Sequence, residues 1–201
     1  MKLQIKDISA VYINPDRFLE RQNKMESWIH TVGLNSVTRI AYNETFPDRA
    51  ITMNHAHKYA LEQSENDVPF ILFEDDATPM QPLPEYFEIP EEADLIYLGG
   101  SNYLSPTGNL RIEEYNEHFY RVYNMLSFHA VLFPNKKSVE KVINLLEKAI
   151  KDIKFNDITI ANSSKENIFL VPKEGNYFFQ DDYTSNVTKF YWKDVLNKFL
   201  K

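Results

Sequence analysis

Apolar residues along the chain follow two alternating kinds of pattern. Short and nearly continuous apolar runs, typical of buried strands, occupy residues 8–14, 37–42, 69–73, 94–98, 127–133 and 168–171. Between several of these runs, apolar residues recur at helical spacing over residues 15–33, 50–63 and 138–153. Strands that alternate with helices predict an α/β fold, with a mostly parallel central sheet flanked by helices.

Length and composition favour one domain over residues 1–201. The 43% of hydrophobic residues suffices for an ordinary core, and no repeat or linker interrupts the chain. No apolar run reaches the length of a membrane span, and residues 1–9 lack the apolar region of a signal peptide. We therefore expect a soluble, cytoplasmic protein without a membrane span.

Charge and cysteine content narrow the possible chemistry. The chain has no cysteine, so carboxylates, histidines and backbone oxygens are the available metal ligands, and these favour hard cations. The net charge of -7 argues against a broad nucleic-acid-binding surface, which needs many lysine and arginine contacts to phosphate.

An acidic cluster stands out because of where it lies. The apolar run 69–73 ends directly in Glu74, Asp75 and Asp76, and in α/β sheets ligands bind beyond the carboxyl ends of the strands. Residues two apart in an extended segment point the same way, so Glu74 and Asp76 can converge on Mn²⁺ or Mg²⁺ while Asp75 faces elsewhere or binds ribose. Such an ion would bridge to a diphosphate and stabilise a departing nucleotide. The alternative is a solvated acidic turn.

The acidic run and several other segments resemble glycosyltransferase family 25, the lipopolysaccharide-type enzymes related to collagen galactosyltransferases. Residues 70–77 look like the strand-plus-acid motif of that family. The other similar pieces, in the same order, are residues 13–17 with Arg21, Asn54-His55 with Tyr59, residues 94–99, residues 129–134, Asn156-Asp157, and Pro172 with Gln180 and Ser185. Asn54 and Tyr59 stand where the family usually has serine and tryptophan. The resemblance implies a GT-A fold, a nucleotide-sugar donor and a metal held mainly by Asp76.

Candidate donor-binding residues lie near the predicted strand ends. Arg17 and Arg21 are four residues apart at the start of a predicted helix, so both can face a diphosphate, or they can form surface salt bridges. The backbone amides of Gly99, Gly100 and Ser101 can contact the donor or form a plain turn. The remaining donor candidates, taken from the resemblance, are Asn54 and His55, the latter being favoured over His57.

The remaining candidate site residues come from the second half of the chain. Asp157 follows the predicted helix 138–153 and is either a general base or a helix-capping residue. His129 lies within an apolar strand and is either a substrate contact or a hydrogen-bonded core residue. Gln180 and Asp181 belong to a second acidic turn that can complete the metal site or hold the acceptor, and Ser185 completes the closing pattern of the resemblance.

These observations predict a metal-dependent hexosyl- or pentosyltransferase. It would move a sugar from a nucleotide-diphosphate donor, expected to be UDP-linked, to a hydroxyl of a saccharide. One alternative acceptor is a hydroxymethylated or glycosylated base of viral DNA, since six lysines lie along the helix 138–153 and its flanks. A second alternative is a non-catalytic domain that binds nucleotide sugars or carbohydrates.

Overall fold

A computed structural model describes residues 1–101 and 110–180, which form an α/β domain around an eight-stranded sheet. The strand order is β3-β2-β4-β10-β7-β11-β9-β8. In chain order these strands are β2 (Ser9–Ile13), β3 (Val37–Ile40), β4 (Phe70–Glu74), β7 (Leu95–Ser101), β8 (Arg111–Glu114), β9 (Phe119–Tyr123), β10 (Leu126–Phe133) and β11 (Phe169–Pro172). All six predicted strand segments are therefore confirmed, while the sequence patterns missed β8 and β9.

Two smaller strand pairs and four α-helices complete the described chain. The pairs are β1 (Lys2–Gln4) with β6 (Tyr86–Glu88), and β5 (Ala77–Pro79) with β12 (Phe178–Gln180). The helices are α1 (Leu19–Ile29), α2 (Arg49–Ser64), α3 (Lys136–Asp152) and the short α4 (Asn156–Asn162), with a 3₁₀ turn, η1, at Ile5–Asp7. None of the helices in these described ranges has the length and apolar character needed to cross a membrane.

The sheet is mixed rather than mostly parallel. Strand β2 is parallel to both β3 and β4, and β11 is parallel to β7, but β10 runs antiparallel to its neighbours β4 and β7. Parallel neighbours need a crossover connection, usually a helix. The strands from β7 to β10 follow one another with no helix in the described part of that segment, so the second half of the sheet is largely antiparallel.

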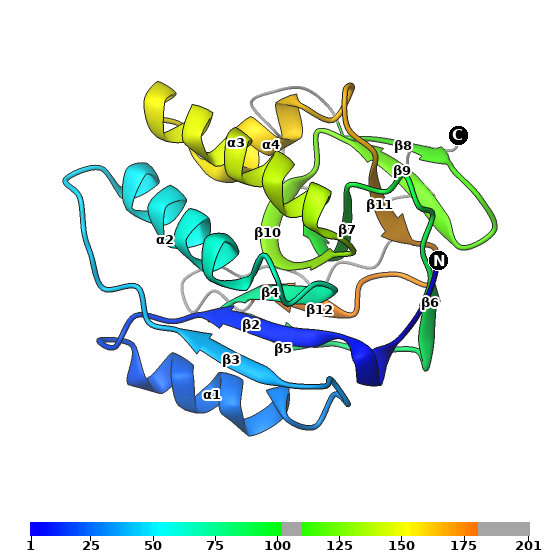
Figure 1. Cartoon of the computed structure of the whole chain (residues 1–201), viewed down its shortest axis with the longest axis horizontal. Helices are drawn as coiled ribbons and strands as arrows, with labels where there is room; N and C mark the ends of the chain where they lie inside the picture. Colours follow the sequence, from blue (N-terminus) through cyan, green and yellow to red (C-terminus); the bar gives the residue numbers. More distant parts are fainter. Residues whose placement is uncertain (102–109, 181–201) are drawn as a thin grey trace.

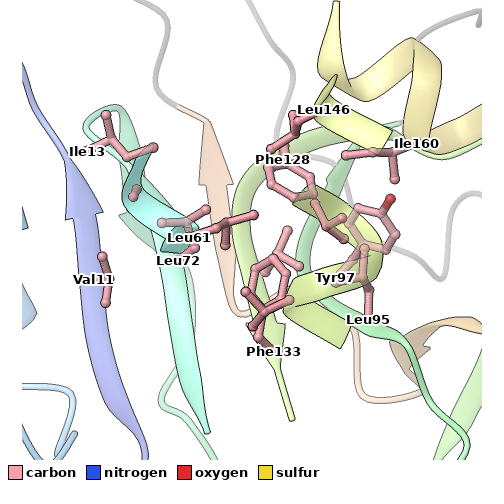
Figure 2. Close-up of a cluster of buried hydrophobic side chains, with 14 of the residues drawn as sticks. Val11, Ile13, Leu61, Leu72, Leu95, Tyr97, Phe128, Phe133, Leu146 and Ile160 are labelled. Atoms are coloured by element: carbon pink, nitrogen blue, oxygen red, sulfur yellow. The ribbon is translucent and has the colours of Figure 1, made fainter. Parts of the chain in front are cut away.

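Both faces of the sheet are buried, which explains the continuous apolar runs. Successive residues of one strand point to opposite faces, so Phe70 and Leu72 join one hydrophobic cluster while Ile71 and Phe73 join the other. Helices α2, α3 and α4 cover the first face, and α1 covers the second (Figure 1). Figure 2 shows the first cluster, where Leu61 of α2 and Leu146 of α3 pack over the sheet.

Local capping sets where the helices begin. Asp48 precedes α2 and its Oδ1 accepts a hydrogen bond of 2.7 Å from the amide of Ala50. Asn135 caps α3 in the same way, through Ser138. Helix α1 begins at Leu19 rather than at Pro15, because residues 15–18 form a turn in which the Phe18 amide donates to the Pro15 carbonyl. That turn brings the start of α1 to the carboxyl end of β2.

Candidate functional site

The acidic cluster lies at the carboxyl end of β4, and its three carboxylates have three different environments. Glu74 is the last residue of β4, and Asp75 and Asp76 form the turn into β5. Asp75 is buried and accepts hydrogen bonds of 2.8 Å from Arg21 Nη1 and from Asn14 Nδ2. Asp75 therefore joins α1 and the end of β2 to the end of β4.

Glu74 faces a buried histidine of α2. His57 Nε2 lies 3.0 Å from Glu74 Oε1, and His57 Nδ1 lies 2.8 Å from the carbonyl oxygen of Met53. Burial disfavours the charged form of each partner, but their mutual attraction outweighs it: the pKa of His57 is raised and the pKa of Glu74 is lowered. Both shifts favour the charged forms, so buried His57 and half-buried Glu74 lie at the right distance for an ion pair. The sequence had favoured His55 instead.

Asp76 is the carboxylate that remains incompletely paired within the described residues. Gln180 Nε2 donates a hydrogen bond of 3.0 Å to its Oδ2, and its Oδ1 is buried without a hydrogen-bond partner in the described chain. Burial and the nearby charge of Glu74 raise the pKa of Asp76 to about 7. A cation beside Oδ1 would supply the missing partner, so Asp76 fits a divalent metal.

The residues around Asp76 do not by themselves complete a metal site. No group of three or more His, Asp or Glu residues in ranges 1–101 and 110–180 has an arrangement suited to a metal ion. Glu74, expected as the second ligand, already lies against His57. An ion at Asp76 would therefore need oxygen ligands from elsewhere, such as a bound diphosphate.

A cleft of about 320 Å³ opens in front of these carboxylates. Its acidic side carries Glu74, Asp75 and Asp76, with Gln180 beside them, and three arginines line it as well: Arg17, Arg21 and Arg49. Arg21 is paired with Asp75, and the Arg17 guanidinium lies 4.7 Å from the centre of the Phe18 ring. A cleft with acids and arginines together can hold a metal ion and the phosphates that it binds.

Arg49 was not among the predicted site residues. It is the first residue of α2, and five residues at helical spacing on this helix line the cleft: Arg49, Thr52, Met53, Ala56 and His57. The spacing was visible in the sequence, but only the position of α2 beside β4 shows that this face of the helix meets the acids.

Two residues of the predicted Asn-His segment lie outside the cleft. Asn54 is buried, and its Nδ2 donates a hydrogen bond of 2.7 Å to the carbonyl of Lys154, which ties α2 to the chain after α3. The His55 ring stacks on Phe46 with 4.5 Å between the ring centres, and it lines a separate cavity. In this arrangement Asn54 has a packing role.

Gly99 and Gly100 lie within β7 rather than in a loop. A methyl group on Gly99 would come within 2.2 Å of His129 Nε2, so the glycine makes room for that ring. Gly100 exchanges two hydrogen bonds with the side chain of Asn176, which occupies its amide and its carbonyl. Ser101 ends the strand and pairs with Leu126 of β10.

His129 is a core residue. It is buried in β10, its Nδ1 shares a hydrogen bond with the Ser127 hydroxyl, and burial lowers its pKa. The ring packs against the backbone of β7 at Gly99, and it does not line the cleft.

Asp157 lies in the first turn of α4, where its Oδ1 accepts a hydrogen bond of 2.7 Å from the Ile158 amide. Burial raises its pKa, and the charges of Glu74 and His57 also act on it. It is not among the residues that line the cleft. Gln180, by contrast, reaches Asp76 from β12, whereas Asp181 and Ser185 lie outside the described residues.

Comparisons with known proteins support the fold class. No protein-family model and no curated protein matches this sequence. The structure is similar to that of a glycosyltransferase involved in the glycosylation of the major capsid of PBCV-1, with a TM-score of 0.59 and 9% identity over 89% of this chain and 94% of that chain. The CTP:phosphocholine cytidylyltransferase from Streptococcus pneumoniae aligns with a TM-score of 0.47 and 13% identity, over 97% of this chain and 79% of that chain.

The first of these similarities shows that the chain has a glycosyltransferase-like fold. At 9% identity it shows the fold alone. The expected α/β class is therefore confirmed, while membership of glycosyltransferase family 25 and the GT-A assignment stay predictions.

Proposed function

We propose that this protein is a glycosyltransferase that moves a sugar from a nucleotide-diphosphate donor to a hydroxyl of a saccharide, with the help of Mn²⁺ or Mg²⁺. The observation that carries the proposal is the cleft that Asp76 lines together with three arginines, where one carboxylate oxygen of Asp76 has no hydrogen-bond partner among the described residues. The glycosyltransferase-like fold supports the same function.

Different residues of the cleft bind different parts of the donor and its metal ion. Arg17 and Arg49 bind the diphosphate, because guanidinium groups match phosphate oxygens in charge and geometry. Asp76 is the principal metal ligand, and Glu74 holds His57 behind it. When bound, the cation neutralises the negative charge that develops on the departing nucleoside diphosphate.

The other contacts position these groups. Gln180 fixes the orientation of the Asp76 carboxylate through its hydrogen bond to Oδ2. Asp75 and Asn14 hold Arg21 at the wall of the cleft, with Asn14 also accepting a hydrogen bond of 3.1 Å from Arg39. A preorganised site of this kind loses little entropy when the donor binds.

Charge pairing on α3 favours a saccharide over DNA as the acceptor. Three lysines of this helix contact acidic side chains, Lys136 with Glu65, Lys141 with Asp94 and Lys148 with Asp152. Ion pairs at these three positions reduce the positive charge that the row of lysines offers for phosphate contacts. The net charge of -7 acts in the same direction.

Nucleotide binding tests the proposal. We expect UDP or GDP with Mn²⁺ to raise the melting temperature of the wild-type protein, and Arg49→Ala to weaken nucleotide affinity about tenfold through loss of one charge-assisted contact. Arg111→Ala is the matched control, because Arg111 is an exposed arginine of β8 outside the cleft. No stabilisation of the wild type by either nucleotide with Mn²⁺ contradicts the proposal.

Turnover separates a transferase from a silent binding domain. An active enzyme releases nucleoside diphosphate slowly from a nucleotide sugar when no acceptor is present, and chelation of the metal stops this release. Nucleotide binding without any release from a panel of nucleotide sugars would favour the non-catalytic alternative.

A further inference from the structure

A second cavity, of about 600 Å³, lies beside the donor cleft. We call it the outer groove. It runs from the segment after β3 across α2 to the last turns of α3, and Tyr42, Tyr59 and Glu147 lie on these three parts of its wall. Tyr42 lines both the outer groove and the cleft.

Helix α2 presents a different face to each cavity. Four of its residues at spacings of three and four line the outer groove: His55, Lys58, Tyr59 and Glu62. The stripe that begins at Arg49 lines the cleft. One helix therefore fixes the distance and orientation between the two cavities. Such an arrangement is suited to holding two substrates that react with each other.

The outer groove has an aromatic wall. The rings of Tyr42 and Tyr59 lie 5.6 Å apart at 48°, and Tyr59 is 42% exposed. Exposed aromatic side chains offer a flat apolar face with a polar edge. The C–H face of a sugar ring is a good match for such a surface.

Carboxylates supply the polar part of the wall. Glu44 accepts a hydrogen bond of 3.1 Å from the Tyr42 hydroxyl, while Glu62 and Glu147 both contact Lys58. Carboxylate oxygens accept hydrogen bonds from hydroxyl groups and have capacity beyond one partner each. The three glutamates outnumber the basic residues of the wall, Lys58 and His55, and this excess of carboxylates disfavours phosphate and other anions.

We propose that the outer groove binds the acceptor as a neutral, hydroxyl-rich saccharide, with one sugar ring against Tyr59 and its reducing or non-reducing end directed past Tyr42 toward the cleft. This inference rests on the proposed transferase function. It assigns the two substrates to cavities of different character: the anionic donor to the cleft that carries three arginines beside its carboxylates, the neutral acceptor to the aromatic groove with three glutamates and one lysine.

Binding of saccharides and of UDP to the same variants tests the assignment. Wild-type protein is screened on an array of neutral and sialylated oligosaccharides, and its affinities for the strongest ligand and for UDP with Mn²⁺ are then measured by calorimetry. Tyr59→Ala removes the exposed ring, and Tyr86→Ala is the matched control because Tyr86 is 36% exposed on β6, outside the groove. The melting temperature of each variant is measured to check that it is folded.

We expect neutral oligosaccharides to bind in preference to sialylated ones. Tyr59→Ala should weaken that binding by about tenfold or more, as truncation of an aromatic anchor does, and should leave UDP affinity within about twofold. Tyr86→Ala should change neither affinity. Unchanged saccharide affinity in Tyr59→Ala, a comparable loss of UDP affinity in that variant, or a wild-type protein that binds no oligosaccharide overturns the assignment.

The same data distinguish failure of this assignment from failure of the proposed function. A wild-type protein that binds a saccharide through Tyr59, yet neither binds UDP nor hydrolyses nucleotide sugars, contradicts the transferase and retains the groove as a saccharide site. A protein that hydrolyses nucleotide sugars while Tyr59→Ala leaves saccharide binding intact retains the transferase and contradicts the groove.

Discussion

Strands β4 and β7 carry similar buried apolar runs, and both pair with β10, yet their ends have opposite roles. The end of β4 passes directly into three carboxylates that face a cleft lined by arginines. The end of β7 continues through Gly99 and Gly100, packed against His129 and Asn176. The residues that follow an apolar run decide whether a strand end opens toward a ligand or is filled by the protein's own side chains.

The largest expected effect follows from removing the charge at the end of β4. Asp76→Asn should lower the rate of sugar transfer by about 100-fold or more, because the principal metal ligand is lost while the isosteric amide keeps the fold. Steady-state rates of donor hydrolysis and transfer measure the effect. Asp67→Asn makes the same chemical change at an exposed residue and should leave the rates unchanged. Full activity in Asp76→Asn would remove Asp76 from the mechanism.

At the end of β7 the expected effect is on stability. Gly99→Ala places a methyl group 2.2 Å from His129 Nε2 and 2.9 Å from the Phe178 carbonyl oxygen, and overpacking of this kind costs about 3 kcal/mol of unfolding free energy. Urea unfolding of Gly99→Ala, His129→Ala and the double variant checks it. The double variant should be more stable than the sum of the two single effects predicts, because loss of the His129 ring removes the closest clash and leaves only the contact with the Phe178 carbonyl oxygen. Additive effects would show that Gly99 does not pack on His129.

A smaller expected effect is the dependence of stability on pH, which arises at the end of β4. The pKa of Asp76 in the folded protein, about 7, is raised by burial above its unfolded value. The stability contributed by protonated Asp76 is therefore complete below the unfolded pKa, near pH 4, and is lost as the pH rises through about 7. In EDTA, the unfolding free energy of the wild type should fall between pH 4 and pH 8 by on the order of 1 kcal/mol relative to Asp76→Asn. Parallel pH profiles for the two proteins would contradict the raised pKa.

Much of the fold was predictable from the sequence because the apolar pattern of each segment matches the way that segment is buried in the folded protein. The runs at residues 69–73 and 127–133 are buried on both faces, and the stripe at residues 138–153 packs against the sheet as α3. The direction of β10 was not predictable from its own residues, because an antiparallel and a parallel buried strand have the same apolar pattern. The mixed sheet follows from the lack of a crossover helix among the residues that the structure describes between β7 and β10.

The candidate site was predictable only in part. The acids at the end of β4 followed from the acidic run and the α/β pattern, and Arg17 and Arg21 followed from their spacing at the start of the helix predicted after the first strand. The sequence could not show that His57 rather than His55 meets Glu74, because adjacent faces of α2 meet different cavities and helical spacing does not say which face meets Glu74. Arg49 and the contact of Gln180 with Asp76 depend on elements distant in sequence, which no local pattern contains.

The most direct test of the central claim is a crystal structure of the protein soaked with Mn²⁺ and UDP or GDP. The account predicts Mn²⁺ bound to Asp76, with the diphosphate between the metal and Arg49 in the cleft at the end of β4. A nucleotide bound elsewhere on the protein, or a metal that does not contact Asp76, would contradict it.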